Sequence, residues 1–329
     1  MKLSYLDLTT TDPAFNLAVE EYVFDHLPKD RMYLMLWQND NAIIIGKHQN
    51  TLAQINEAFV REHGIKVVRR LSGGGAVYHD MGNLNFTIIT DAENTDALNF
   101  RLLCQPVIRA LEQVGVKAEI NGRNDMTIDG KKFSGNAQYV RGGRIMHHGT
   151  ILFDSNSAIL AQALQVDEEK IRAKGVKSVR SRVTNVRPCL PRDMTLPEFR
   201  KILLKSILEE APGQAYTLTD ADLAVIEQLK QRYESWDWNY GRSPACTLLK
   251  KQRVEGCGTV EAYLTLRSGV IEDIQFRGDF FSAADPEELA QLLQGSRPEP
   301  DVIRAALAKT DVAKYFMGLD MEALIQILS

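Results

Sequence analysis

Hydrophobic residues near the start of the chain recur with the period of an amphipathic helix. Apolar positions from Phe15 to Val23 follow the i, i+3, i+4 spacing, and Asp12-Pro13 supplies a helix start. This pattern predicts a helix from Pro13 to about Leu27. Short runs rich in Ile, Val, Phe and Tyr then predict strands at 33–37, 42–45, 66–68 and 84–89.

The middle of the chain predicts a helix followed by a series of strands. A second helical pattern runs from Phe100 to Gly115, although Pro106 argues against an unbroken helix. Strands are predicted at 117–121, 126–129, 132–140 and 145–153, with hairpin turns at Asp129-Gly130 and Gly142-Gly143. Helical patterns return at 157–164, 196–208 and 220–233.

A new set of elements begins near Thr247. Alternating positions around 259–266 predict a strand, and a turn at 267–269 leads into a second strand at 270–276. Three short helices are predicted after Pro286, Asp301 and Asp320. The chain is therefore expected to be α/β (α+β), with a large N-terminal domain at 1–244 and a small α+β domain at 245–329.

Composition narrows the class of protein. The chain has 329 residues and a net charge of −4, which is not typical of a general duplex-DNA binder. Cys104, Cys189, Cys246 and Cys257 form no C-x-x-C pair, so neither a zinc site nor a disulfide framework is expected. Asp7 interrupts any signal-peptide core, and no apolar run approaches the ~18 residues of a membrane helix. These features predict a cytoplasmic protein with no membrane and no nucleic-acid partner.

The first candidate for chemistry is the glycine-rich segment Arg69-Arg70-Leu71-Ser72-Gly73-Gly74-Gly75-Ala76-Val77-Tyr78-His79-Asp80. Successive backbone N–H groups in such a loop can cradle an anion, and Arg70 can add a bidentate contact. The alternative is an ordinary glycine-rich turn with solvated arginines. The segment matches neither a P-loop nor the dinucleotide-binding G-x-G-x-x-G motif.

Three further segments carry polar groups. Lys132 can act as a phosphate-binding point charge beside the polar loop Gly122-Arg123-Asn124-Asp125, or it can be one of two surface lysines. His147 and His148 point to opposite faces of a strand, so they are a poor chelating pair and no structural metal is expected. The stretch 170–187 holds seven basic residues and no acidic residue. It can be a solvated loop, an RNA-binding patch or a loop that closes over a polyphosphate.

Together, five segments resemble the lipoate–protein ligase family in their order and approximate spacing. They are Arg69 to Asp80 with Gly82-Asn83-Leu84-Asn85, Gly122 to Asp125, Lys132 to Ala137 with His147 to Thr150, Lys174 to Val186, and Trp238 to Gly241. Each motif alone has little specificity, but the five in register identify the family. The resemblance implies mixed sheets of the kind shared by biotin and lipoate ligases, followed by a mobile C-terminal domain.

The resemblance also implies the roles of individual residues. Lys132 would be the catalytic residue, stabilising charge between the lipoyl carbonyl and the α-phosphate. The nucleotide-binding residues would be Arg70, Gly75, Ala76, Val77, Tyr78, Asn83, Asp125 and Lys132. The lipoate-binding residues would be Ser72, His79, Lys132, Asn136, Ala137, His148 and Gly149. A loop with Lys174, Ser178, Arg180 and Arg182 would cover the adenylate, and Asp125 or Asn124 would ligate Mg²⁺.

The implied reaction is ATP-dependent lipoate–protein ligation. Lipoate and ATP would give lipoyl-AMP and pyrophosphate, and the acyl group would then pass to a lysine of a lipoyl carrier. The implied carriers are the lipoyl domains of 2-oxoacid dehydrogenase E2 subunits and the glycine cleavage H protein. ATP and Mg²⁺ would be the cofactors, lipoate a substrate, and the protein a monomer.

Three related enzymes are alternatives. A lipoyl or octanoyl transferase would use a preformed activated acyl group, either through a cysteine thioester or from lipoyl-adenylate. A biotin–protein ligase would carry a different phosphate loop. The absence of cysteine from the pocket motifs argues against the thioester route.

Overall fold

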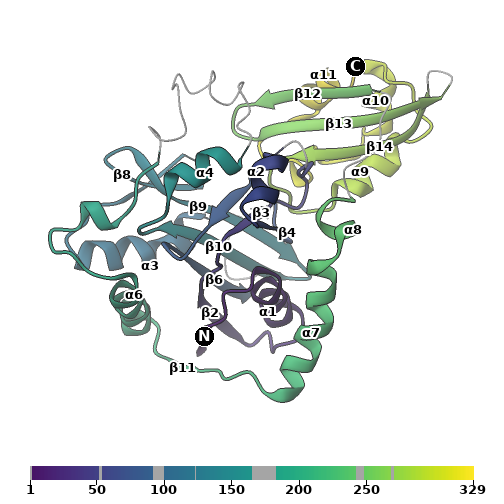
Figure 1. Cartoon of the computed structure of the whole chain (residues 1–329). Helices are drawn as coiled ribbons and strands as arrows, with labels where there is room; N and C mark the ends of the chain where they lie inside the picture. Colours follow the sequence, from purple (N-terminus) through teal and green to yellow (C-terminus); the bar gives the residue numbers. More distant parts are fainter. Residues whose placement is uncertain are drawn as a thin grey trace.

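The N-terminal part of the molecule is organised around one mixed eight-stranded sheet (Figure 1). A computed structural model describes residues 2–51, 54–91, 100–122, 124–164, 183–241, 248–267 and 270–329. The strand order is β11-β1-β2-β6-β10-β9-β8-β7. The strands are β1 (Lys2–Asp7), β2 (Arg31–Trp37), β6 (Asn83–Asp91), β7 (Glu119–Asn121), β8 (Asp125–Ile128), β9 (Lys131–Arg141), β10 (Arg144–Leu152) and β11 (Gly213–Ala215).

A second sheet of three short strands lies beside it, in the order β4-β3-β5. Its strands are β3 (Ala42–Ile45), β4 (Lys66–Arg69) and β5 (Val77–His79). The helices α2 (Glu57–Glu62) and α4 (Ser157–Ala163) share a hydrophobic cluster with this sheet. The small sheet brings the glycine-rich segment between β4 and β5 next to the large sheet.

Alternating side chains of the large sheet enter two separate cores. Leu34 and Leu36 of β2 pack with α3 (Phe100–Gln113) and α6 (Leu196–Glu210) on one face. Met35 and Trp37 point to the other face, where they pack with α1 (Pro13–Asp25) and α7 (Asp220–Glu234). This period of two is what a sheet covered on both faces requires. The helix predicted from Phe100 is confirmed and stays unbroken through Pro106.

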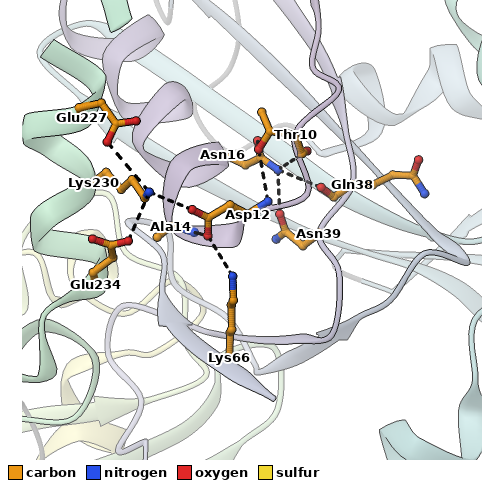
Figure 2. A network of polar contacts seen from close by, with 10 residues as sticks. All are labelled: Thr10, Asp12, Ala14, Asn16, Gln38, Asn39, Lys66, Glu227, Lys230 and Glu234. Atoms are coloured by element: carbon orange, nitrogen blue, oxygen red, sulfur yellow. Dashed lines mark hydrogen bonds and ion pairs between the residues drawn. The ribbon is translucent and has the colours of Figure 1, made fainter. Parts of the chain in front are cut away.

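The start of α1 is tied to two neighbouring elements through its N-cap. The Asp12 side chain accepts a hydrogen bond from the Ala14 N–H, and Pro13 occupies the first helical turn. The same carboxylate pairs with Lys66 of β4 at 3.5 Å and with Lys230 of α7 at 3.2 Å (Figure 2). The predicted helix start is thus confirmed, and it also joins α1 to the small sheet.

The C-terminal part forms its own sheet and core. The strands β12 (Leu248–Val254), β13 (Gly258–Arg267) and β14 (Val270–Gly278) pair antiparallel. The helices α9 (Pro286–Leu293), α10 (Pro300–Ala306) and α11 (Met321–Leu328) complete a separate hydrophobic cluster. The predicted α+β appendage is confirmed. The predicted boundary between 244 and 245 lies outside the described residues and stays a prediction.

Several elements were not predicted from the sequence, among them β1, β5, β11, β12 and α2. The 3-10 turns at Arg187–Cys189 and Val312–Lys314 were not predicted either. Strands of three residues carry too few positions to show a period. In β12 the sequence Leu-Leu-Lys-Lys-Gln-Arg-Val pairs neighbouring residues of like type and hides the alternation. Within the described residues no helix is long and apolar enough to cross a bilayer.

The Trp238 to Gly241 segment, singled out from sequence, anchors the end of β4. It overlaps the short helix α8 (Trp236–Asn239). The Asn239 side chain is buried, accepts a hydrogen bond from the Arg69 backbone N–H at 2.8 Å and donates to the Tyr233 carbonyl at 2.7 Å. The Asn239 carbonyl in turn accepts from the fully buried Arg69 guanidinium at 3.1 Å. This segment therefore positions the chain that leads into the glycine loop.

Replacing Asn239 by alanine should destabilise the N-terminal part, because the substitution leaves the buried Arg69 N–H without an acceptor. The expected loss is about 1–3 kcal/mol in the free energy of unfolding. Urea unfolding followed by tryptophan fluorescence measures it. Asp237→Ala, at an exposed position of the same helix, is the control. An equally small effect of both changes would contradict the anchoring role.

Candidate active site

A cavity of about 110 Å³ lies between the large sheet and the small sheet. Its floor follows the register of the large sheet. Trp37 of β2 pairs with Asn85 of β6, and Asn85 pairs with Thr150 of β10. The opposite side comes from β3, β5, α1 and the loop between β4 and β5.

The lining combines apolar walls with a set of hydrogen-bonding groups. The apolar side chains are Leu17, Trp37, Ile44, Ala76, Val77 and Ala137. The polar ones are Arg70, His79, Asn85, Asn124, Lys132, Asn136, His148 and Thr150. Such a mixture is typical of a site that holds an apolar ligand and orients it by a few polar contacts.

The Arg70 guanidinium holds the glycine loop by hydrogen bonds to its backbone. Its Nη2 donates to the Gly73 carbonyl at 2.6 Å and to the Gly75 carbonyl at 2.9 Å, and its Nη1 donates to the Ile44 carbonyl. Burial lowers the pKa of Arg70 to about 10, and the negative charge of Glu20 opposes that shift. The guanidinium therefore stays charged at neutral pH while it holds the loop.

Two of the three glycines of the loop are required, for different reasons. A Cβ on Gly73 would lie 2.4 Å from the Phe280 carbonyl oxygen of the C-terminal part, so the two backbones can approach only at a glycine. The Gly74 N–H donates to the same carbonyl at 3.2 Å, and its φ of 92° is in the left-handed region. Only Gly75 faces open space. Gly73 and Gly74 are thus confined by packing and conformation, whereas Gly75 leaves open space beside the loop.

A buried chain of hydrogen bonds runs under the cavity. The Arg70 Nε–H donates to Ser72 Oγ at 3.0 Å, and Ser72 Oγ lies 2.5 Å from His148 Nε2. His148 Nδ1 lies 2.9 Å from a carboxylate oxygen of Glu20, which also accepts from the Thr87 hydroxyl. The Ser72 hydroxyl accepts a hydrogen bond from Arg70, and its own O–H is free to donate to His148 when His148 Nδ1 carries the ring proton that faces Glu20.

Lys132 lies at the edge of the cavity near a single carboxylate. Its Nζ is 2.7 Å from Asp125 Oδ1, and the two side chains are 38% and 25% exposed. The Lys132 carbonyl accepts from the Thr184 N–H at 2.8 Å, which holds this part of β9 against the segment that follows residue 182. Lys132 thus presents a positive charge to the cavity from a fixed backbone.

Some buried polar atoms in the cavity lining have no protein partner among the described residues. They are His79 Nε2, Asn85 Nδ2 and Asn136 Oδ1. Burial, with the charges of Arg70 and His148, lowers the pKa of His79 to about 3, so its imidazole is neutral. Unpaired buried donors and acceptors are rare in proteins, and here they face a cavity that a ligand can fill.

The structure brings together most of the residues singled out from sequence. Arg70, Gly75, Ala76, Val77, His79, Lys132, Asn136, Ala137, His148 and Gly149 all line the cavity. Ser72 and Asp125 contact lining residues without lining the cavity themselves. The Tyr78 side chain points into another cluster and donates to Asn41, and Asn83 donates to Asn85 behind the lining. Lys174, Ser178, Arg180 and Arg182 lie outside the described residues.

Asn85 and Thr150 stand in two of the quoted motif segments but were given no role, and the lining residues Leu17, Trp37 and Ile44 were not singled out from sequence. Asn85 carried a usable signal, since it is a buried polar residue within an apolar strand. Trp37 reads as an ordinary core residue of β2 until its pairing with Asn85 is known.

No described cysteine lines the cavity. Cys104 is fully buried on α3, with its Sγ 3.7 Å from Nε2 of His147, and burial raises its pKa to about 12. His147 and His148 indeed point to opposite faces of β10. The Cys104 thiol is therefore protonated at neutral pH and lies away from the cavity.

Solved structures and sequence relatives converge on one class of protein. An ATP-bound lipoate-protein ligase A has a TM-score of 0.65 and 26% identity, covering 73% of this chain and 99% of that one. A bipartite archaeal lipoate protein ligase from Thermoplasma acidophilum, described with its E2 lipoyl domain, has a TM-score of 0.67 and 29% identity, covering 75% and 100%. The fold and site therefore define a ligase catalytic domain of this type.

Sequence comparison extends the match to nearly the whole chain. The family model for the lipoyl protein ligase A/B catalytic domain matches residues 12–208, and the model for the bacterial lipoate protein ligase C-terminus matches residues 243–328. Lipoate-protein ligase LplJ of Bacillus subtilis is 46% identical over 321 residues, covering 96% of this chain and 97% of that protein. The chain belongs to the lipoate–protein ligase family, which confirms the resemblance seen in its motifs.

Acid should destabilise the folded protein through its buried histidines. Burial holds the pKa of both His79 and His147 near 3, whereas an unfolded histidine titrates near ~6.5. The unfolded chain therefore binds protons that the folded chain does not, and stability falls as the pH drops from about 6.5 towards 3. Each such histidine lowers the free energy of unfolding by about 1.4 kcal/mol by pH ~5.5.

The difference in unfolding free energy between pH 7.5 and 5.5 should shrink by about 1 kcal/mol in His147→Gln. Urea unfolding at both pH values measures this difference, and an unchanged difference would contradict the burial argument.

Proposed function

We propose that the chain activates lipoate with ATP and transfers the lipoyl group to a lysine of a carrier protein. The observation that carries the proposal is the cavity, in which Lys132 meets apolar walls beside the glycine loop. Membership of the lipoate–protein ligase family supports lipoate as substrate. The ATP-bound relative supports ATP as the second substrate.

In the first half-reaction, a carboxylate oxygen of lipoate attacks the α-phosphorus of ATP. A C–O–P anhydride forms, the bond between the α- and β-phosphates breaks, and pyrophosphate leaves with the electron pair. Lys132 stabilises the negative charge that gathers on the α-phosphate and the lipoyl carbonyl. The backbone of Gly75, Ala76 and Val77 holds the nucleotide, and Arg70 keeps that backbone in shape by binding the Gly73 and Gly75 carbonyls.

In the second half-reaction, the carrier lysine amine attacks the acyl carbonyl. An amide bond forms, the anhydride C–O bond breaks, AMP leaves with the electron pair, and the amine loses a proton. The proposed carriers are lipoyl domains of 2-oxoacid dehydrogenase E2 subunits and the glycine cleavage H protein. The archaeal relative described with an E2 lipoyl domain supports a carrier of this kind.

Mg²⁺ is expected with the polyphosphate. The described residues include no cluster of three or more His, Cys, Asp or Glu side chains that could hold a metal alone. Asp125 pairs with Lys132 and Asn124 lines the same cavity, so they fit an ion that uses one carboxylate together with substrate phosphates. When bound, the ion would neutralise phosphate charge.

We also propose a cytoplasmic monomer with domains at 1–244 and 245–329. The residues Lys174, Ser178, Arg180 and Arg182 would form the loop that covers the adenylate. The buried, protonated Cys104 gives no support to a thioester mechanism.

Lys132→Ala should lower the rate of lipoate-dependent pyrophosphate release by about 10²–10³-fold, because it removes a positioned charge from the reacting atoms. The assay uses the full chain with ATP, Mg²⁺ and lipoate, with and without an apo lipoyl domain. Mass spectrometry detects the lipoyl-lysine on the carrier.

Lys131→Ala is the matched control, since Lys131 is the exposed neighbour on the same strand. This variant should keep the wild-type rate. Carrier modification from preformed lipoyl-AMP without any pyrophosphate release would identify a transferase and contradict the adenylation step.

A further inference from the structure

The orientation of one buried asparagine is fixed by the protein backbone. Asn16 Nδ2 lies 3.0 Å from the Thr10 carbonyl and 2.9 Å from the Gln38 carbonyl (Figure 2). Main-chain carbonyls can only accept hydrogen bonds, so the atom that faces both of them must be the NH₂ group. The amide of Asn16 therefore has one possible orientation.

This orientation determines that of the next amide. Asn39 Oδ1 lies 2.9 Å from the same Asn16 NH₂ group (Figure 2). The two N–H groups of Asn16 are shared among three acceptors, and an Asn39 nitrogen at this distance would place two donor groups against each other. The facing atom of Asn39 is therefore its oxygen, and its nitrogen points the other way. That nitrogen lies 3.1 Å from His79 Nδ1, and Asn39 itself is fully buried.

The tautomer of His79 follows from this chain of contacts. An NH₂ group can only donate, so His79 Nδ1 must accept and cannot carry a proton. The single proton of the neutral ring is then on Nε2. His79 Nε2 is buried, lines the cavity and has no partner among the described residues.

We propose that Asn39 is a positioning residue that holds His79 as a neutral donor, with its Nε2–H aimed at an acceptor atom of the bound acyl substrate. The inference rests on the proposed function, because it takes the cavity to be the lipoate site. The imidazole also lies in a T-shaped contact with the Trp37 ring at 6.1 Å between centroids, and the charges of Arg70 and His148 act on it.

A second polar side chain of the cavity lining is also incompletely paired. The amides of Asn83 and Asn85 make one hydrogen bond with each other at 2.9 Å, and the remaining amide atom of each, Asn83 Oδ1 and Asn85 Nδ2, has no partner among the described residues. An unpaired buried donor is costly unless a ligand satisfies it. His79 Nε2 and the Asn83–Asn85 pair are therefore buried polar groups that a polar ligand group can satisfy.

The tautomer can be read directly from the full-length protein labelled with ¹⁵N-histidine. Long-range ¹H–¹⁵N correlation at pH 7.5 should show His79 protonated at Nε2 and unprotonated at Nδ1, with the signals assigned by their loss in His79→Ala. A proton on Nδ1 in the wild type would overturn the proposal, and this result requires no variant of Asn39.

The functional test uses Asn39→Asp, which keeps the acceptor for Asn16 but removes the donor to His79. His79 should change to the Nδ1–H tautomer or the cation, and the lipoate concentration that gives half-maximal pyrophosphate release should rise about tenfold. In a His79→Ala background the same change should add less than twofold, because Asn39 acts through His79. Additive losses would mean a merely structural role and would overturn the proposal.

Asn156→Asp is the matched control. It makes the same chemical change at an exposed helix cap, where aspartate serves equally well, and should behave as wild type in both assays. Titration of lipoate tests the placement of lipoate in this cavity separately from the fixed tautomer of His79. If His79 has the expected tautomer but its signals do not move with lipoate, the placement of lipoate in this cavity fails rather than the fixed tautomer.

Discussion

The candidate site depends on the buried hydrogen-bond chain that joins Arg70, Ser72, His148 and Glu20. It connects the glycine loop to β10 of the large sheet and to α1. The two end links have one direction, because the arginine can only donate to Ser72 and the carboxylate of Glu20 accepts from His148. Loss of a middle member would leave buried polar groups without partners, which costs more than the bond itself contributes. The shape of the loop and the position of its histidine are therefore set together.

The C-terminal part contributes to the same loop from the other side. The Phe280 carbonyl receives the Gly74 N–H, and His48 stacks on the Phe280 ring at 4.8 Å. Phe281 packs against Phe100 in a small cluster that also includes Ala137 of the cavity lining. The glycine loop is thus held on one side by the Arg70 guanidinium and on the other by the backbone at Phe280. This explains why Gly73 is confined by packing, while Gly75 is left open towards the site.

Local patterns in the sequence predicted most of the helices and strands but few of the long-range hydrogen bonds around the cavity. The helix after Asp12 and the central hairpins follow from periodicity and turn residues, which act over a few positions. Ser72 and His148 are 76 residues apart, and His148 and Glu20 are 128 apart, so their contact appears only once the strand order is known. The contacts of Arg70 with the Gly73 and Gly75 carbonyls could not be predicted, because an arginine beside a glycine run looks the same whether it binds a ligand or its own loop. Its expected contact with phosphate stays a prediction.

The most direct measurement is a crystal structure of the full chain with a hydrolysis-resistant lipoyl-adenylate analogue. Our account predicts the acyl chain between the two sheets, with its carbonyl within hydrogen-bond distance of Lys132 Nζ. Arg70 should still bind the Gly73 and Gly75 carbonyls, and the nucleotide should lie on the loop backbone. An analogue bound outside this cavity, or an acyl carbonyl out of reach of Lys132, would contradict the account.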